Sequence, residues 1–137
     1  MKEFWDNYRY TDPVAAALEA AFGVKFYLEN TGGGCVCLHG DIDADTYILV
    51  GSAADGPLLR DEERSDFPFH GGWHIGVYED VSGYTLGDAY DYTAMSADEV
   101  VLLAKTALEL VPRHTDDTRV VWQRDAAGDV TEERWPR

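Results

Sequence analysis

The segment from Ser96 to Pro112 constrains the fold most, because it has the pattern of one amphipathic helix with both ends marked. Ser96 and Glu99 have the spacing of a capping box, and Pro112 ends the segment. The apolar residues recur at helical spacing along a single stripe: Val100, Leu103, Ala104, Ala107, Leu108 and Val111. A helix with one apolar stripe must pack on another element, so the rest of the chain has to supply a surface for it.

A second, shorter helix is predicted near the N-terminus. We expect Asp12 as its N-cap and Pro13 at its first helical position, where a missing N–H costs little, and Gly23 ends it. Its apolar stripe consists of Val14, Ala17, Leu18 and Ala21. This helix also needs a surface on which to pack.

The segments between and after the helices supply that surface as β-strands. Period-two alternation, typical of half-buried strands, covers residues 24 to 29, 35 to 41, 46 to 51, 73 to 77 and a short stretch around 84 to 86. Residues 119 to 124 and 130 to 135 flank a turn-rich spacer, which predicts a C-terminal β-hairpin. The expected fold class is therefore α+β: an antiparallel sheet of four to five strands, two helices packed on one face, and the hairpin.

Length and composition indicate one folded domain spanning residues 1 to 137. A chain of 137 residues has the commonest domain size, and hydrophobic residues make up 45%, which is too many for disorder. One stretch, from Ser52 to Gly72, has no periodicity. Stretches of this length without secondary structure are usually functional or mobile.

The net charge narrows the classes of partner. With 26 acidic and 11 basic residues the formal charge is −15, which repels nucleic acid and anionic membranes. We therefore expect neither direct nucleic-acid binding nor membrane binding. No apolar run reaches the roughly 18 residues needed to span a bilayer, and the N-terminus has no signal-peptide pattern, so we expect a cytoplasmic protein.

Cys35, Cys37 and His39 form the one constellation suited to a soft metal. On a strand all three side chains leave the same face, and His70 or His74 is available as a fourth ligand. A structural zinc site usually draws paired ligands from turns, which this segment lacks. We therefore expect reduced, metal-free cysteines and no cofactor, and we keep a small-molecule or metal site on this face as the alternative.

Other short patterns do not meet the requirements of known catalytic or ion-binding motifs. The triplet Asp41, Asp43 and Asp45 has the spacing that opens a calcium loop, but Thr46 and Ser52 stand where that loop needs Gly and Glu. A hairpin turn explains the triplet better. We find no motif for a nucleophile or a general base, so we expect a protein that is not an enzyme.

Acidic and aromatic residues together predict a protein-binding surface. In and after the aperiodic stretch, four acidic residues stand beside three aromatic residues that resemble interface anchors: Asp61, Glu62, Glu63 and Asp66, then Phe67, Phe69 and Trp73. We expect this segment to share one acidic patch with Asp41, Asp43 and Asp45. The alternative is a solvated loop whose aromatic residues only pin it to the sheet.

Part of the chain resembles a group of phage proteins. Residues 29 to 35, the acidic turn, Tyr47 to Val50 and Gly76 to Tyr78 are similar to small uncharacterised accessory proteins of actinobacterial phages, over roughly residues 24 to 80. The resemblance implies a role on host factors. It implies no activity and no catalytic residues.

The leading hypothesis is a non-enzymatic accessory protein that binds a basic, nucleic-acid-associated host protein, as an inhibitor or as a DNA mimic. On a strand, Asp41, Asp43 and Asp45 would stand about 6 to 7 Å apart, a spacing comparable to successive phosphates. Besides this hypothesis and the metal or small-molecule site described above, a third possibility is that the acidity serves solubility alone.

Overall fold

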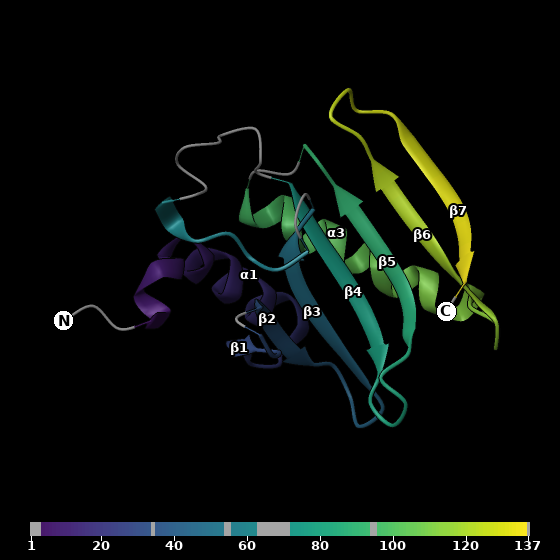
Figure 1. Cartoon of the computed structure of the whole chain (residues 1–137), viewed down its shortest axis with the longest axis horizontal. Coiled ribbons are helices and arrows are strands. Elements are labelled where there is room, and N and C mark those ends of the chain that lie inside the picture. Colours follow the sequence, from purple (N-terminus) through teal and green to yellow (C-terminus); the bar gives the residue numbers. More distant parts are fainter. Residues whose placement is uncertain (1–3, 34, 54–55, 63–71, 94–95, 137) are drawn as a thin grey trace.

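The computed structural model describes residues 4–33, 35–53, 56–62, 72–93 and 96–136, which form an α+β fold with a seven-stranded sheet (Figure 1). The N-terminal half contains the helices η1 (Phe4–Thr11) and α1 (Asp12–Phe22), then β1 (Phe26–Asn30), β2 (Val36–Asp41) and β3 (Thr46–Ser52). The C-terminal half contains β4 (Trp73–Glu79), β5 (Thr85–Asp91), α3 (Ala97–Leu110), η2 (Val111–Arg113), β6 (Thr118–Arg124) and β7 (Val130–Pro136).

The sheet is mixed, with its strands in chain order from β1 to β7. Strands β1 to β5 form an antiparallel meander, β6 runs parallel to β5, and β7 returns antiparallel to β6. The prediction of an antiparallel sheet of four to five strands is therefore only partly right: β1 to β5 are antiparallel, but the C-terminal hairpin extends the same sheet to seven strands. The connection through α3 is long enough for a crossover, so β6 enters parallel to β5.

The strand β5 (Thr85–Asp91) is longer than the short stretch around 84 to 86 that the sequence predicts. Gly87 lies within β5 at a point where α3 packs closely on the strand. A Cβ at this position would lie 3.1 Å from Leu110 Cβ and 3.2 Å from the Ala107 carbonyl oxygen. A glycine inside a strand often marks such a close approach. The close packing of α3 on β5 thus accounts for a glycine at this position in the strand.

Both helices end largely as their sequences predict. At the start of α3, Ser96 Oγ accepts from the Glu99 N–H at 3.2 Å, and Glu99 Oε1 accepts from the Ser96 N–H at 3.2 Å, which completes the capping box. Gly23, with φ of 69°, ends α1. The N-cap of α1 is Thr11 rather than Asp12, because η1 runs directly into α1.

The core lies between the sheet and the two helices, which pack on the same face of the sheet (Figure 1). Fully buried side chains come from both layers, among them Leu18, Val36, Ile48, Ile75 and Val100. Among the described residues, no helix or strand packs on the opposite face of β1 to β5, and we call this surface the open face. No described helix is long and apolar enough to cross a membrane.

Candidate functional site

An aromatic ladder crosses the open face on four neighbouring strands. The rings of Tyr27, His39, Tyr47 and Tyr78 stack in series, with centroids 5.1, 5.0 and 5.2 Å apart and interplanar angles of 15°, 9° and 14°. Strand register produces the stack, since Tyr27 is paired with His39 and Tyr47 with Tyr78. Tyr27 at one end is 41% exposed, so the ladder begins at the protein surface.

Carboxylates surround the ladder. Glu29 Oε2 lies 2.5 Å from His39 Nδ1, and Asp41 Oδ1 lies 2.8 Å from His39 Nε2. A neutral imidazole has one N–H and can donate to only one of these two oxygens. Burial, followed by the charges of Asp41 and Glu29, raises the pKa of Tyr27 above its ordinary value. The ladder therefore lies in a region of negative potential.

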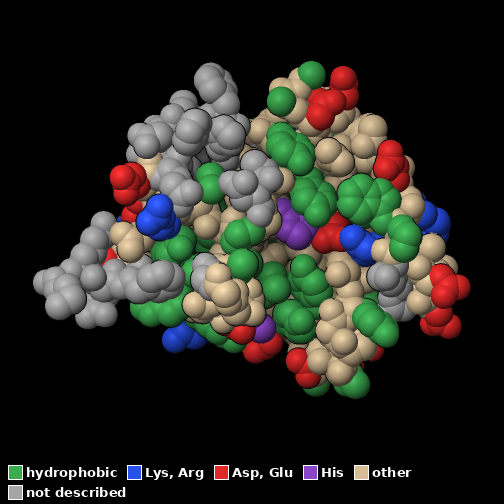
Figure 2. All heavy atoms as spheres, in the orientation of Figure 1, with side chains coloured by type: hydrophobic (Ala, Val, Ile, Leu, Met, Phe, Trp, Pro, Cys, Tyr) green, Lys and Arg blue, Asp and Glu red, His purple; other side chains and the backbone are tan. Residues whose placement is uncertain are grey.

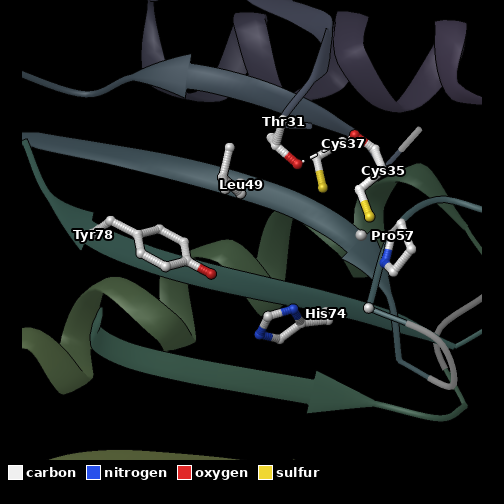
Figure 3. A pocket seen from close by; sticks show the side chains of 9 residues that line it. Thr31, Cys35, Cys37, Leu49, Pro57, His74 and Tyr78 are labelled. Carbon is white, nitrogen blue, oxygen red and sulfur yellow. Dashed lines mark hydrogen bonds between the residues drawn. The ribbon is translucent and has the colours of Figure 1, made fainter. Parts of the chain in front are cut away.

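A hollow of about 230 Å³ opens beside the ladder on the same face. Its walls are mainly apolar and include Cys35, Cys37, Leu49, Pro57, His74 and Tyr78. Figure 3 shows both sulfur atoms and the Tyr78 hydroxyl turned toward this space. Burial, then the neighbouring Cys35 and Glu29, raises the pKa of Cys37 to about 11, so its thiol stays protonated at neutral pH.

A charged network borders the hollow on the side of β5. His74 Nε2 lies 2.7 Å from Asp88 Oδ1, and Arg119 Nε donates to Asp88 Oδ2 at 2.5 Å. The His74 ring stacks on Tyr90 with centroids 4.3 Å apart, and the Arg119 guanidinium lies over Trp135. Burial alone would raise the pKa of Asp88, but the hydrogen bonds and charges of His74 and Arg119 lower it below its ordinary value.

Figure 2 shows how these groups are arranged on the molecular surface. Hydrophobic side chains gather across the middle of the open face, a histidine lies among them beside one acidic and one basic side chain, and most of the visible Asp and Glu side chains lie toward the margin. An apolar centre with a charged rim is the usual anatomy of a protein interface.

The open face has some parts of a catalytic site, but the thiol of Cys37 is not activated. His74 held by Asp88 resembles the base and orienting acid of a triad, and two thiols line the same hollow. Catalytic cysteines have lowered pKa values, whereas the pKa of Cys37 is raised. A protonated Cys37 thiol is a poor nucleophile.

The constellation of Cys35, Cys37 and His39, kept as the alternative metal site, is divided in the structure. His39 is held in the aromatic ladder, while Cys35 and Cys37 line the hollow. His70 lies outside the described residues, and within the described ranges no three His, Cys, Asp or Glu side chains are grouped closely enough to hold a metal ion.

Asp61, the first residue of the predicted acidic segment, contacts the N-terminal helix η1. The Asp61 carboxylate accepts from the backbone N–H groups of Arg9 at 3.1 Å and Tyr10 at 3.0 Å, so it fixes η1 to this segment. Glu62 is exposed. The four other predicted binding residues, Glu63, Asp66, Phe67 and Phe69, lie outside the described residues.

Trp73 is a core residue, not an exposed anchor. It is 3% exposed on the helix side of β4, where its ring lies 5.9 Å from that of Tyr10. It shares this side of the strand with the buried Ile75 and Val77, as the alternation of β4 requires.

The aspartate triplet forms the turn between β2 and β3. Asp41 ends β2 and binds His39, while Asp43 Oδ1 accepts from the Asp45 N–H at 2.8 Å. The strand spacing expected for a DNA mimic is therefore not formed here. The turn precedes β3 and residues 56–62 follow it, so about 20 Å of strand separates these two acidic segments (Figure 1). The structure therefore does not bring Asp61 and Glu62, the described residues of the second segment, into one patch with the turn.

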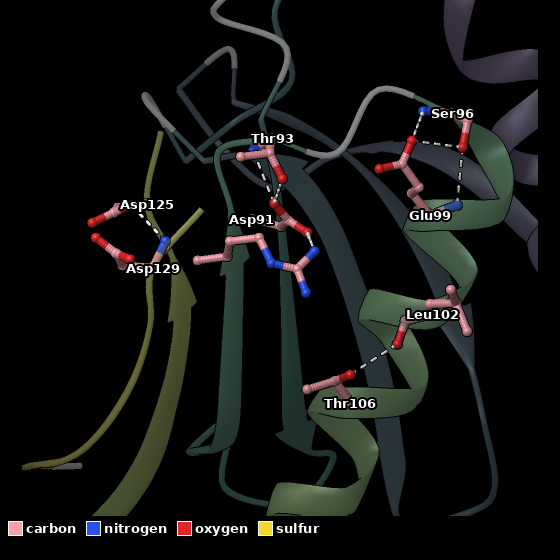
Figure 4. A network of polar contacts seen from close by, with 9 residues as sticks. Asp91, Thr93, Ser96, Glu99, Leu102, Thr106, Asp125 and Asp129 are labelled. Carbon is pink, nitrogen blue, oxygen red and sulfur yellow. Dashed lines mark hydrogen bonds and ion pairs between the residues drawn. The ribbon is translucent and has the colours of Figure 1, made fainter. Parts of the chain in front are cut away.

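A second hollow, of about 100 Å³, lies between α3 and β6, next to Asp91. Asp91 Oδ1 accepts from the N–H and the hydroxyl of Thr93 at 2.8 and 2.7 Å, and Oδ2 accepts from Arg124 at 3.0 Å (Figure 4). The Arg124 guanidinium lies over Trp122. Both oxygens of Asp91 thus hold the end of β5 through hydrogen bonds. These bonds give the buried carboxylate of Asp91 a structural role.

The sequence interpretation missed the aromatic ladder and the Asp88 network. The signal was present, because Tyr27, His39, Tyr47, His74 and Tyr78 all occupy the polar phase of their alternating strands. Their convergence depends on strand register, which that pattern alone does not give.

Comparison with other proteins adds no functional assignment. The chain matches no protein-family model, and no characterised protein or solved structure is significantly similar to it. The fold and the open face define an α+β protein with one helix-covered and one aromatic sheet face. A functional proposal therefore has to come from the geometry of that open face.

Proposed function

We propose that this chain is a non-enzymatic protein-binding module that holds a basic segment of a partner protein on its open face. The observation that carries the proposal is the aromatic ladder with Glu29 and Asp41 beside it. Stacked rings with carboxylates beside them suit Arg and Lys side chains, because a cation is attracted both to the ring face and to the carboxylate.

The histidine already within the ladder illustrates this chemistry. His39 lies flat between Tyr27 and Tyr47, and its nitrogen atoms face Glu29 and Asp41. A planar guanidinium can stack at the exposed end of the ladder on Tyr27 in the same manner. The net charge of −15 favours fast encounter with a basic partner.

A basic segment of this kind is characteristic of nucleic-acid-associated proteins, so we propose such a protein as the partner. The resemblance to phage accessory proteins favours a host protein. Any DNA mimicry would use the distribution of charge over the whole protein, because the triplet of Asp41, Asp43 and Asp45 forms a turn.

The test uses a fluorescein-labelled peptide of alternating Gly and Arg, with binding followed by fluorescence anisotropy. We expect binding that weakens as salt rises, and about fivefold weaker binding to the double variant Glu29→Gln, Asp41→Asn. The matched control is Glu19→Gln, Glu109→Gln, which makes a similar change in charge on α1 and α3. Equal weakening by both pairs would show that the acidity acts only generally, as the solubility hypothesis holds.

A further inference from the structure

The hollow beside the aromatic ladder has the size of a site for one side chain. Its volume of about 230 Å³ is below the roughly 300 to 1,000 Å³ of sites for drug-sized ligands. It also lies on the proposed binding face, next to the ladder: Cys37 pairs with Glu29 across β1 and β2, and Leu49 pairs with His39 across β2 and β3. A peptide that follows the ladder therefore passes beside the hollow.

The chemistry of the walls favours an apolar occupant over a charged one. The carboxylate nearest to His74 is Asp88, and both of its oxygens are already bound, one by His74 and the other by Arg119. Glu29 is not among the residues that line the hollow, and its Oε2 faces His39 Nδ1 at 2.5 Å. A cation inside the hollow would lose its water without gaining a free carboxylate, which is costly.

The thiol and phenol groups at the hollow are also uncharged. Burial raises the pKa of both Cys37 and Tyr78, so at neutral pH each presents a protonated, weakly polar surface. Together with Leu49 and Pro57 they form a wall against which an aliphatic side chain can pack.

We infer that the hollow receives one apolar side chain, such as leucine, which the basic segment of the partner carries beside its cationic residues. The inference rests on the proposed function, because the same segment places its Arg or Lys residues on the aromatic ladder. Residues two apart in an extended peptide point the same way and stand about 6 to 7 Å apart. The recognised pattern is therefore an apolar residue with a basic residue two positions away.

The experiment compares two fluorescein-labelled peptides on the full chain. Both peptides alternate Gly and Arg, and in one of them a central Arg is replaced by Leu, whereas in the other the same Arg is replaced by Gly. We expect the Leu peptide to bind about tenfold more tightly, as burial of a leucine side chain predicts. Leu49→Trp, which fills the hollow, should remove this difference, and the control Leu102→Trp, at a 62% exposed position on α3, should keep it.

A second measurement on the unmodified chain does not depend on how the variants fold. Saturating Leu peptide should slow the alkylation of Cys37 by iodoacetamide at least threefold, and saturating Gly peptide should not. Equal affinities for the two peptides, or equal alkylation rates, would overturn the inference and leave the proposed function intact. Failure of both peptides to bind would instead reject the proposed function, and the inference with it.

Discussion

Arg119 Nε lies 2.5 Å from Asp88 Oδ2 and thereby joins β6 to β5, the parallel strand pair of the sheet. The two side chains are 17% and 3% exposed, so the ion pair is largely shielded from water. The same carboxylate binds His74 on β4, and one buried group thus connects three strands. This network links the meander of β1 to β5 to the C-terminal hairpin and also forms one border of the hollow.

The first prediction concerns the strength of this contact. Arg119→Met should lower the free energy of unfolding by about 3 kcal/mol, because it leaves a buried carboxylate with only His74 as a partner. Urea denaturation followed by circular dichroism measures the change. The control is Arg113→Met, which removes an ion pair to Glu132 that is 49% and 42% exposed and should change stability by less than about 1 kcal/mol. A similar loss in the two variants would contradict the role assigned to Arg119.

The second prediction concerns the pH dependence of stability. His74 and Arg119 hold the pKa of Asp88 below its ordinary 3.8, so the unfolded chain binds this proton more readily than the folded chain does. The stabilisation is therefore complete above pH about 5, where Asp88 is ionised in both states, and is lost as the pH falls through the lowered pKa. Asp88→Asn lacks this contribution.

Urea titrations of the unmodified chain and of Asp88→Asn at a series of pH values measure the effect. The difference in unfolding free energy should be constant above pH about 5 and should shrink below pH about 4. A difference that stays constant at low pH would show that the charge of Asp88 does not stabilise the fold.

The third prediction concerns the thiols of the hollow. With Cys35→Ser the chain retains one cysteine, Cys37, whose pKa in the unmodified chain is about 11, about 2 above the ordinary 9.0, with burial as the largest cause. At pH 8 this difference makes the thiolate fraction about a hundredfold smaller than that of an ordinary thiol. The more basic thiolate is, however, about tenfold more reactive. Alkylation by iodoacetamide should therefore be about tenfold slower in the folded protein than in urea. Faster reaction in the folded protein would indicate an activated thiol and reopen the question of catalysis.

The sequence predicts a helix or strand well when residues typical of its start and its end are both present. Ser96, Glu99 and Pro112 locate α3 to within two residues, because capping and helix termination depend on near neighbours. The parallel placement of β6 depends instead on how α3 crosses the sheet, which no local pattern records. The contact of Asp61 with Tyr10 spans 51 residues and is equally invisible to a local pattern.

The candidate site was less predictable than the fold for the same reason. Alternation places Trp73 on the same side as Ile75 and Val77, so its burial follows from the pattern that predicted β4. The stacking of His39 with Tyr47 requires the register of β2 against β3. The acidic clusters predicted a site at the turns and in the aperiodic stretch. In the described residues, the aromatic and charged contacts lie in the middle of the sheet.

The last prediction concerns Gly76, which lies on the open face under the ring of Tyr78. A Cβ at this position would lie 2.6 Å from Tyr78 Oη and 2.7 Å from Tyr78 Cε2, so the ring would have to move. Gly76→Ala should therefore lower the free energy of unfolding by about 1 kcal/mol, as overpacking does. It should also lower the pKa of Tyr78 toward its ordinary 10.0, because burial is the main cause of the shift.

A double-mutant cycle separates this clash from any general effect of alanine in the strand. In the background of Tyr78→Ala the ring is gone, and Gly76→Ala should then stabilise the protein by about 0.5 kcal/mol, since glycine is unfavourable inside a strand. Urea denaturation of the four proteins measures the two steps, and ultraviolet titration of tyrosinate follows the pKa. If Gly76→Ala has the same effect with and without the ring, Tyr78 does not cover Gly76, and the wall that Tyr78 gives to the hollow is misplaced.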